Sequence, residues 1–325
     1  MKNFEIIVIG GAFAGLTAAI YSGRQGFRTV VISKDIGGQG LLTTDIQNYP
    51  GFMSISGFEL ASKFQEQALQ YGVEFVYDEV TAVSQNGDIF EVRTTQEEFS
   101  ADSVILAFGK TPRDLGVPGE ERFKGKGVSY CAICDGPLFR GKIVTVAGAG
   151  DHALQAALYL STVASRVNLV IRSPRLLGDQ DMVSSIKASE NVTVTLGTKV
   201  TEILGDQYVD TIKTISSDGT ESSIETSALF VEMGYIAKTE FIREFVELNK
   251  EGEVIIDSNC STSREGVFAA GDVTNQPFKQ AVISAGQGSV AALSSINYVN
   301  RKKGRTTVKS DWKFIPKPEG EKAPQ

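Results

Sequence analysis

Phe4–Gly15 has the sequence FEIIVIGGAFAG, and Leu16–Ser22, which follows it, has the sequence LTAAIYS. The apolar run with β-branched residues, the glycine-rich segment and the helix-forming residues predict a buried strand, a tight turn and a helix. A second apolar run, Thr29–Ile32, follows at the distance that a strand–helix–strand unit requires. The backbone N–H groups of such a turn and the dipole of its helix can hold a pyrophosphate group. The stretch therefore predicts a nucleotide-binding unit, although Ala12 stands where the motif usually has its second glycine.

The same order of segments recurs in the middle of the chain. Ile143–Val146 is an apolar run, and Ala147–Ala153 (AGAGDHA) is a second glycine-rich turn. A helical pattern then continues to about Val163, and Val167–Ile171 is again apolar. The recurrence indicates an internal duplication of the nucleotide-binding unit.

Each copy also contains a hairpin signal and a closing strand. Asn86-Gly87 and Asp218-Gly219 are dipeptides typical of hairpin turns. Val104–Phe108 and Ala228–Met233 are apolar strands, and a glycine follows each of them. The predicted fold class is therefore α/β, with two Rossmann-like, three-layer ββα nucleotide-binding domains.

A third segment completes the predicted organisation. Gly266–Val273 is an apolar strand ending near Gly-Asp, and Gln280–Leu293 is helical in pattern, but no glycine fingerprint accompanies them. The economical arrangement is that this segment completes the first domain, so that the second domain is inserted into it. The expected divisions are a first domain of residues 1–115 and 247–305, an inserted domain of residues 116–246, and a flexible C-terminal tail of residues 306–325.

Composition limits the classes of function. The 325-residue chain has a net charge of −7, with its charges scattered, which argues against a surface for nucleic acid. The longest apolar stretch, Ile6–Tyr21, is too short to span a bilayer and lacks the features of a signal peptide, so we expect no membrane association. The three cysteines make no disulfide framework, and we expect a cytoplasmic protein.

Two of the cysteines form a C-x-x-C motif, Cys131-Ala-Ile-Cys134. Thiol–disulfide exchange needs two sulfurs that can close a small ring, and a nearby helix N-terminus lowers the thiolate pKa. The alternative is zinc, which would require both residues together with Cys260 and His152, in a spacing that matches no common zinc pattern. We therefore favour a redox-active pair and expect no metal site.

Two neighbouring features have more than one interpretation. Asp135, directly after the second cysteine, could move protons to and from a thiolate, but a helix cap would look the same; we favour the proton-transfer role. Cys260 is expected to be a small packed residue and not a further redox centre. Trp312, the only tryptophan, either folds over a cofactor or lies in an exposed tail, and the exposed tail is favoured.

Gly127–Lys142 (GVSYCAICDGPLFRGK) closely resembles the active-site stretch of the low-molecular-weight thioredoxin reductases, and the likeness runs in register from about Phe4 to Val299. The resemblance implies that the first domain holds FAD. It places Gly37–Gln39 and Asn48–Gly51 beside the isoalloxazine, Asp272 at the ribityl chain, and Lys279–Ala281 at the pyrimidine end of the flavin. The expected FAD-binding residues are Gly10, Gly11, Ala12, Phe13, Ala14, Gly15, Gly38, Gln39, Asn48, Gly271, Asp272, Lys279, Gln280 and Ala281.

The resemblance also implies an activity. Reduced flavin would pass two electrons to the Cys131–Cys134 disulfide, and the dithiol would then exchange with the disulfide of thioredoxin or a similar protein. By the family pattern Cys134 would face the flavin and Cys131 would attack the protein substrate. A homodimer is implied, as is a rotation of the inserted domain that presents the dithiol alternately to the flavin and to the substrate.

The inserted domain departs from the family pattern. Gly148, Gly150 and Ala153 keep the GxGxxA fingerprint, but the family usually has a small hydroxyl residue in place of His152. NADPH-dependent members carry H-R-R-x-x-x-R where this chain has Ile171–Leu177 (IRSPRLL). Of the expected phosphate ligands only Arg172 is in place, with Arg175 as a possible substitute, and no acidic residue at the strand end suits NADH.

Two alternatives for the electron donor therefore stay open. The inserted domain has a weak or altered NADP(H) or NAD(H) site, or it has none. Without one, electrons would come from another donor, such as a reduced ferredoxin or a deazaflavin. A redox-sensing flavoprotein without turnover is a further alternative, which the intact C-x-x-C-D sequence disfavours.

Overall fold

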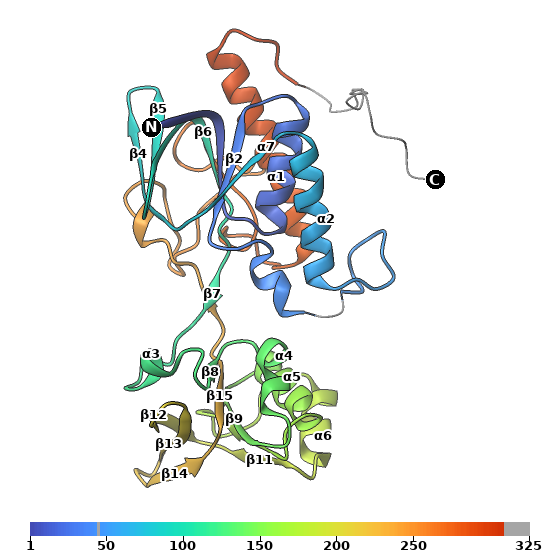
Figure 1. Cartoon of the computed structure of the whole chain (residues 1–325), viewed down its shortest axis with the longest axis vertical. Coiled ribbons are helices and arrows are strands. Elements are labelled where there is room, and N and C mark those ends of the chain that lie inside the picture. Colours follow the sequence, from blue (N-terminus) through green and yellow to red (C-terminus); the bar gives the residue numbers. More distant parts are fainter. Residues whose placement is uncertain (44–45, 309–325) are drawn as a thin grey trace. The chain divides into compact units, whose positions relative to one another are not determined.

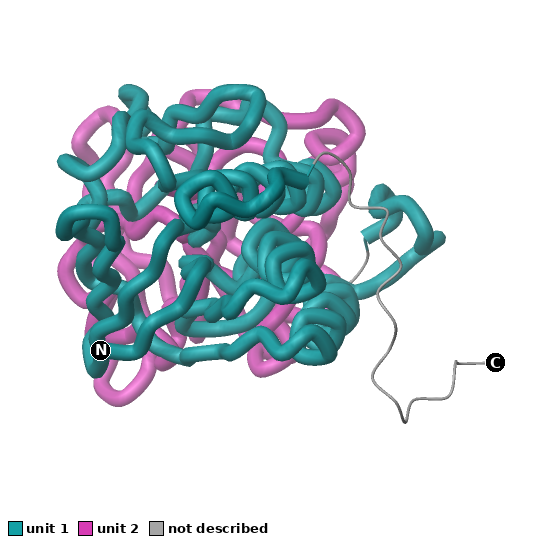
Figure 2. The backbone as a smooth tube through the Cα atoms, turned by 90° about the horizontal axis from the view of Figure 1, so that it is seen from above, with its two compact units in different colours: residues 1–110, 237–325 teal, residues 111–236 magenta. Residues whose placement is uncertain are grey.

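The computed structural model describes residues 1–43 and 46–308, and the chain divides into two compact units, coloured separately in Figure 2. Unit 1 comprises Met1–Lys110 and the segment from Ala237 onward, and unit 2 comprises Thr111–Ile236. The expected boundaries, at residues 115 and 246, lie further along the chain than these. The chain enters and leaves unit 2 through a two-stranded ribbon, in which β7 (Thr111–Pro112) pairs with β16 (Tyr235–Ile236). Trp312 and most of the expected tail lie outside the described residues.

Unit 1 is built on a seven-stranded sheet, and the segment of residues 237–256 packs on one of its faces (Figure 1). The strand order is β3-β2-β1-β6-β5-β4, with β17 paired to β6. Strands β1, β2, β3, β6 and β17 are parallel, whereas β4 and β5 join antiparallel. The strands are β1 (Lys2–Ile9), β2 (Thr29–Ser33), β3 (Glu74–Tyr77), β4 (Val80–Asn86), β5 (Ile89–Thr94), β6 (Glu98–Leu106) and β17 (Val267–Ala269).

Three helices cover the other face of this sheet: α1 (Phe13–Arg24), α2 (Gly57–Gln70) and α7 (Ala281–Lys302). Both faces of β1 are buried, since Ile6 and Ile7 point to opposite sides and neither is exposed, as expected for a central parallel strand. Helix α1 packs closely on α7 because Gly288 has no side chain; a Cβ there would lie 2.2 Å from the carbonyl oxygen of Ala14. A 3₁₀ helix, η1 (Gly38–Leu42), precedes α2.

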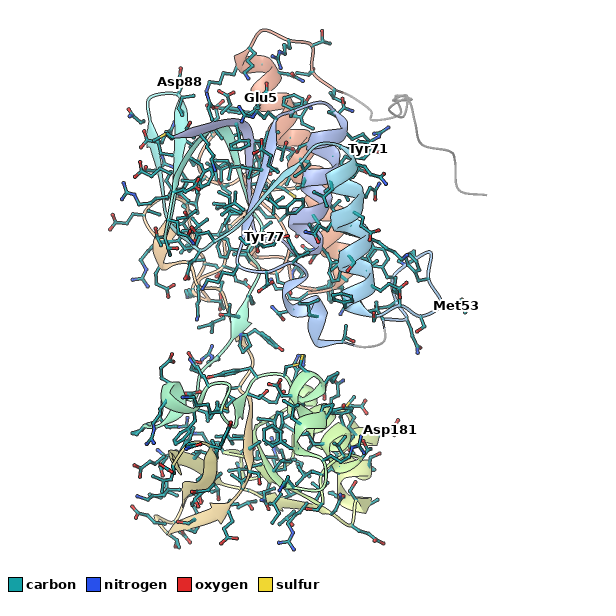
Figure 3. The ribbon with its side chains drawn as sticks, viewed as in Figure 1. Glu5, Met53, Tyr71, Tyr77, Asp88 and Asp181 are labelled. Atoms are coloured by element: carbon teal, nitrogen blue, oxygen red, sulfur yellow. A yellow bond between two sulfur atoms is a disulfide. The ribbon has the colours of Figure 1, made fainter. Side chains whose placement is uncertain are left out.

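The C-terminal end of α7 is anchored by ion pairs to the sheet. Lys303 Nζ lies 2.7 Å from Glu5 Oε1 and 2.8 Å from Asp102 Oδ2. Burial alone would raise the pKa of Glu5, but its hydrogen bonds with Lys303 and with two arginines, together with the charge of Lys303, outweigh that effect and lower the pKa. Figure 3 shows Glu5 on β1 beneath this end of the helix. The helix therefore extends to Lys302, well beyond the predicted end at Leu293.

Unit 2 repeats the design with a five-stranded parallel sheet in the order β11-β10-β9-β15-β8. One face carries α5 and α6, and the other face packs against an antiparallel sheet of β12, β13 and β14. The strands are β8 (Val128–Ser129), β9 (Ile143–Gly148), β10 (Arg166–Val170), β11 (Val192–Thr195), β12 (Thr198–Gly205), β13 (Val209–Ser216), β14 (Glu221–Glu225) and β15 (Ala228–Glu232). The helices are α3 (Glu120–Phe123), α4 (Ala132–Asp135), α5 (Asp151–Ser161) and α6 (Gln180–Ala188), with 3₁₀ helices η2 (Gly136–Phe139) in this unit and η3 (Glu240–Ile242) in unit 1.

Both units have the predicted α/β class, and unit 2 is inserted into the chain of unit 1. Each predicted strand that opens or closes a copy forms, and each hairpin dipeptide lies at the turn that joins two antiparallel strands. Within the described part of the chain, no helix is both long and apolar enough to cross a membrane.

Candidate active site

The turn between β1 and α1 is shaped for close approach to a ligand. Gly10 has a φ of 113°, and a Cβ on it would lie 2.3 Å from the carbonyl oxygen of Ala107, so the position requires glycine. A Cβ on Gly15 would lie 1.9 Å from the carbonyl oxygen of Gly10, which keeps the helix tight against the turn. Ala12 is the N-cap of α1. No side chain caps this helix, and its first turn has no acidic residue.

The residues expected in this turn, Gly10–Gly15, are therefore grouped around one helix N-terminus. Uncapped amide groups at such a terminus attract anions, because they carry unsatisfied N–H groups and the positive end of the helix dipole. A pyrophosphate group fits this arrangement of charge and space.

Asp35 belongs to the same region, and the sequence analysis missed it. It follows the end of β2 by two residues, and its Oδ1 accepts a hydrogen bond of 3.1 Å from the amide of Gly38. An acidic residue at the end of the second strand is the group that commonly binds a ribose hydroxyl in this fold. Its distance from the glycine fingerprint was the signal that could have identified it.

Asp272 follows β17 at the carboxyl end of the sheet. Its Oδ1 accepts a hydrogen bond of 3.2 Å from Ser284 Oγ on α7, and burial raises the pKa of Asp272. Gln287, also on α7, accepts a hydrogen bond of 2.8 Å from the amide of Gly271. Ser284 and Gln287 were not predicted as site residues, but both lie in the predicted helix. Ser284 thus holds a half-buried carboxyl group that has further capacity to accept hydrogen bonds, and Gln287 fixes the backbone directly before it.

The remaining expected ligands of unit 1 come from two distant stretches of chain. Asn48 Nδ2 donates a hydrogen bond of 2.9 Å to Gln280 Oε1, and Gln280 is the N-cap of α7. Gln39 Nε2 donates one of 2.8 Å to the carbonyl oxygen of Lys110. Ala281 is the first residue of α7. The structure thus connects the stretch around Asn48 with the start of α7.

Lys279 is fixed by a second set of contacts. Its Nζ lies 2.5 Å from the carbonyl oxygen of Thr274 and 3.0 Å from Glu253 Oε1, and Lys110 Nζ lies 2.7 Å from the same carboxylate oxygen. Burial by itself would raise the pKa of Glu253, but hydrogen bonds from Lys110, Lys279 and Asn249 outweigh it and lower the pKa. The carboxylate is therefore ionised at neutral pH and holds both lysines at this end of unit 1.

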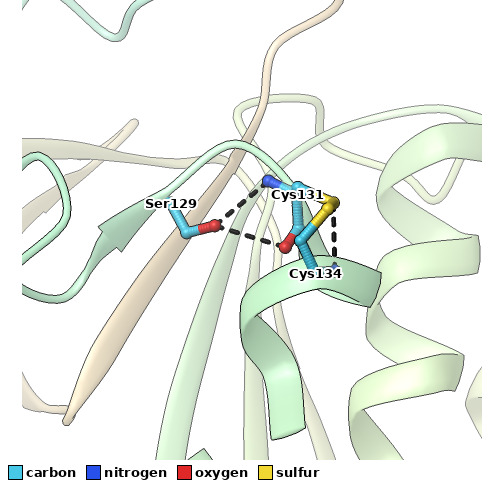
Figure 4. The surroundings of a disulfide bond; sticks show 3 residues. All are labelled: Ser129, Cys131 and Cys134. Carbon is cyan, nitrogen blue, oxygen red and sulfur yellow. Dashed lines mark hydrogen bonds between the residues drawn. A yellow bond between two sulfur atoms is a disulfide. The ribbon is translucent and has the colours of Figure 1, made fainter. Parts of the chain in front are cut away.

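Cys131 and Cys134 form a disulfide in unit 2 (Figure 4). Cys131 is the N-cap of the short helix α4, and its Sγ accepts a hydrogen bond of 3.0 Å from the amide of Cys134. Ser129 Oγ accepts a hydrogen bond of 3.1 Å from the amide of Cys131 and donates one of 3.3 Å to its carbonyl oxygen. Cys134 is exposed and Cys131 is partly buried. The pair is thus held rigidly at the surface of unit 2.

The residues around the disulfide add polar groups. Asp135 is the last residue of α4, and its side chain makes no capping hydrogen bond to η2. Tyr130, directly before Cys131, places its hydroxyl 2.6 Å from Asp114 Oδ1 and 2.8 Å from Glu120 Oε1. Burial and these two carboxylates raise the pKa of Tyr130 far above its usual value. Tyr130 was not predicted, and it ties the redox segment to the chain entering unit 2.

The glycine fingerprint of unit 2 forms a turn like that of unit 1. Gly148 ends β9, Gly150 is the N-cap of α5 with a φ of 80°, and Ala153 is buried in the helix. Arg172 and Arg175, the expected phosphate ligands, are exposed on the loop after β10. The expected residues therefore occupy the expected elements.

Two acidic residues lie beside this turn. Asp151 is the first residue of α5, and Glu232 pairs in register with Gly148 at the end of the neighbouring strand. Burial raises the pKa of Glu232 to about 7. The ring of His152 lies against that of Tyr235, with centroids 5.6 Å apart. The turn thus has the backbone shape of a nucleotide site, with an acidic residue at its helix N-terminus and a buried one at the neighbouring strand end.

The cysteines and the histidine considered for zinc are not brought together as a site. Cys131 and Cys134 are bonded to each other, and Cys260 lies buried in unit 1, where burial raises its pKa to about 11. Among the described residues, no group of three His, Cys, Asp or Glu side chains is arranged to hold a metal ion.

Comparison with known proteins places this geometry in a family. A family model for pyridine nucleotide-disulphide oxidoreductases matches residues 4–288. A thioredoxin reductase of Treponema pallidum is 36% identical over 302 residues, covering 92% of this chain and 98% of that protein. An NADH dehydrogenase of Bacillus subtilis is 37% identical over 302 residues, but this chain spans only 59% of its length.

Comparison with solved structures indicates the same family. Thioredoxin reductase of Lactococcus lactis has a TM-score of 0.82 and 32% identity, with 92% of this chain and 99% of that chain covered. A ferredoxin-flavin thioredoxin reductase of Clostridium acetobutylicum has a TM-score of 0.53 and 31% identity, with 94% of this chain and 100% of that chain covered. This chain belongs to the pyridine nucleotide-disulphide oxidoreductase family and, within it, to the low-molecular-weight thioredoxin-reductase type.

Proposed function

We propose that this protein is an FAD-dependent disulfide reductase that passes electrons through Cys131 and Cys134 to thioredoxin or a similar protein disulfide. The observation that carries the proposal is the disulfide between these two residues, which is held at the surface of unit 2 with a hydrogen-bond donor directed at one sulfur. Family membership supports it, because thioredoxin reductases are among the relatives that match nearly the whole chain.

Unit 1 is the proposed FAD-binding domain. The amide groups at the start of α1 would hold the pyrophosphate, and Asp35 would accept a hydrogen bond from the adenosine ribose. Asp272 would accept hydrogen bonds from the ribityl chain, while Gln39, Asn48 and the segment Lys279–Ala281 would surround the flavin ring. When bound, FAD supplies a carrier that takes up two electrons from a donor and delivers them to a disulfide.

The reactions of the dithiol balance in atoms and charge once the flavin has supplied two electrons. Two electrons and two protons convert the Cys131–Cys134 disulfide into two thiols. Attack by the Cys131 thiolate on the protein substrate forms a mixed disulfide and expels one substrate sulfur as a thiolate, which takes up a proton. Attack by the Cys134 thiolate on Cys131 Sγ then restores the original disulfide and releases the second substrate thiol.

The contacts around the pair support these roles. The Cys134 amide donates to Cys131 Sγ, and this hydrogen bond stabilises a thiolate on Cys131 more than one on Cys134. Cys131 is therefore the better nucleophile toward the substrate and the better leaving group when Cys134 attacks. Asp135, which does not cap η2, would exchange protons with the thiol that forms.

A second candidate concerns the source of electrons. Reduced ferredoxin or a deazaflavin would replace NAD(P)H as the donor, with the dithiol chemistry unchanged. The carboxyl groups of Asp151 and Glu232 beside the turn of unit 2 favour this version. The likeness to the Clostridium acetobutylicum ferredoxin-flavin thioredoxin reductase is consistent with it.

We also propose that the protein acts in the cytoplasm as a homodimer with FAD bound. The acidic composition and the three cysteines support the location, and the family pattern supports the dimer. Sedimentation of the flavin-loaded protein would test the dimer, and a molar mass of one chain would contradict it.

Trapping of the mixed disulfide tests the proposed function. The Cys134→Ser variant retains the attacking thiol and lacks the resolving one, so it should form a stable adduct with a bacterial thioredoxin in its disulfide form. The matched Cys131→Ser variant should form little adduct, and peptide mapping should place the new bond at Cys131. Equal adducts from both variants, or none from either while flavin is retained, would contradict the proposal.

A further inference from the structure

Glu232 lies where nucleotides bind to parallel sheets of this kind. It is the last residue of β15 and pairs in register with Gly148, the last residue of β9. A Cβ on Gly148 would lie 2.1 Å from the carbonyl oxygen of Glu232 and 2.9 Å from its Cβ. The carboxyl ends of two central strands and the glycine turn therefore meet at this residue.

The side chain of Glu232 is on the same face of the sheet as α5. Phe230, two residues earlier on β15, packs in one apolar cluster with Ala153 and Leu154 of α5. Val231 packs in the cluster on the opposite face. Because side chains alternate along a strand, Glu232 shares the face of Phe230 and lies beyond it, toward the start of α5.

The start of α5 carries a second carboxylate. Asp151 is its first residue, and its Oδ1 accepts a hydrogen bond of 2.7 Å from the amide of Asp179. The corresponding turn of α1 in unit 1 has no acidic residue. Two turns built by the same topology therefore differ in charge, and only the one in unit 1 is electrostatically suited to an anion.

The surroundings of Glu232 do not neutralise it with a cation. Among the described residues it has no ion pair, and burial raises its pKa. Burial and Glu232 also raise the pKa of Tyr235, whose ring packs against His152 of α5. The carboxyl group is thus close to the aromatic pair at the mouth of the turn.

We propose that Glu232, with Asp151, excludes pyridine nucleotides from the turn of unit 2, which makes it a residue that determines donor specificity. A dinucleotide brings two phosphate charges to the amides that open α5, where like charges repel. The inference rests on the proposed function, and it means that electrons enter the enzyme from a donor that does not bind this turn.

Calorimetric titration with NADPH and with NADH at pH 8 tests the proposal on the flavin-loaded protein. The wild type should show no saturation up to about 1 mM nucleotide. Glu232→Gln, which keeps the shape of the side chain, should bind at least one nucleotide about tenfold more tightly, equivalent to about 1.4 kcal/mol, and Asp151→Asn added to it should increase the gain. Glu225→Gln, an equal change of charge at an exposed position of unit 2, is the matched control and should not differ from the wild type.

Two results would overturn the proposal. One is micromolar binding of NADPH or NADH by the wild type. The other is a double variant that melts cooperatively and retains flavin yet binds neither nucleotide more tightly than the wild type. Binding is read directly, so a failure to reduce thioredoxin would count against the proposed function and leave this test intact.

Discussion

Replacement of Glu232 by glutamine should remove a large part of the pH dependence of folding stability. Burial raises the pKa of Glu232 from 4.5 to about 7, and no cation compensates for it among the described residues. The folded state therefore binds this proton more tightly than the unfolded state does. Its contribution is most favourable below pH 4.5 and is lost as the pH rises through the window from 4.5 to about 7.

The magnitude follows from the two pKa values. The difference between 4.5 and about 7, at about 1.4 kcal/mol for each pH unit, amounts to about 3.5 kcal/mol in total. About 2.5 kcal/mol of this change in stability falls between pH 5 and pH 8, and the rest falls below pH 5. The Glu232→Gln variant cannot ionise at this position, so its advantage over the wild type should grow by that amount over the same interval.

Urea unfolding followed by circular dichroism at pH 5, 6, 7 and 8 measures this difference. Glu225→Gln serves as the control, because Glu225 is exposed and its replacement should leave the pH profile unchanged. Parallel pH profiles for the wild type and Glu232→Gln would refute the reasoning, since they would mean that the carboxyl group titrates alike in the folded and unfolded chains.

Three further outcomes follow from the site geometry. Asp272→Ala should weaken FAD binding by about 1–3 kcal/mol, because it removes an acceptor from a half-buried position; unchanged flavin retention on dialysis would argue against this role. Gly10→Ala should yield flavin-poor protein that melts at lower temperature, since its Cβ would lie 2.3 Å from the carbonyl oxygen of Ala107; normal flavin content would contradict the tight fit. Tyr130→Phe should destabilise unit 2 by about 1–3 kcal/mol in urea unfolding, because buried Glu120 loses a hydrogen-bond donor; an unchanged midpoint would exclude this contribution.

The features of the fold that could be predicted are those encoded locally. The apolar run ending at Ile9 and the glycines after it predict β1 and its turn, because both signals lie within a dozen residues. Helix α2 was not predicted, although Ser56 accepts a hydrogen bond from the amide of Glu59, a cap that the sequence S-x-x-E also signals. The end of α7 depends on ion pairs with Glu5 and Asp102, which the sequence does not place nearby.

The candidate site also contains some residues that the local sequence predicts and others that only the folded structure identifies. Cys131 and Cys134 could be predicted because their spacing alone brings the two sulfurs together. Glu232 could not, because its significance arises only when β15 pairs with β9 and sets it beside Gly148. Asp35 is intermediate: its position after the second strand was a usable signal, but its contact with Gly38 required the folded turn.

Anaerobic reductive titration tests the central claim most directly, because it counts the electrons that the protein can hold. With FAD bound, the wild type should take up four electrons per chain from dithionite, two for the flavin and two for the Cys131–Cys134 disulfide, and it should pass all four to an excess of oxidised thioredoxin. The Cys131→Ser/Cys134→Ser variant should take up two electrons and pass none. An uptake of two electrons by the wild type, or equal transfer by the double variant, would contradict a redox role for this pair.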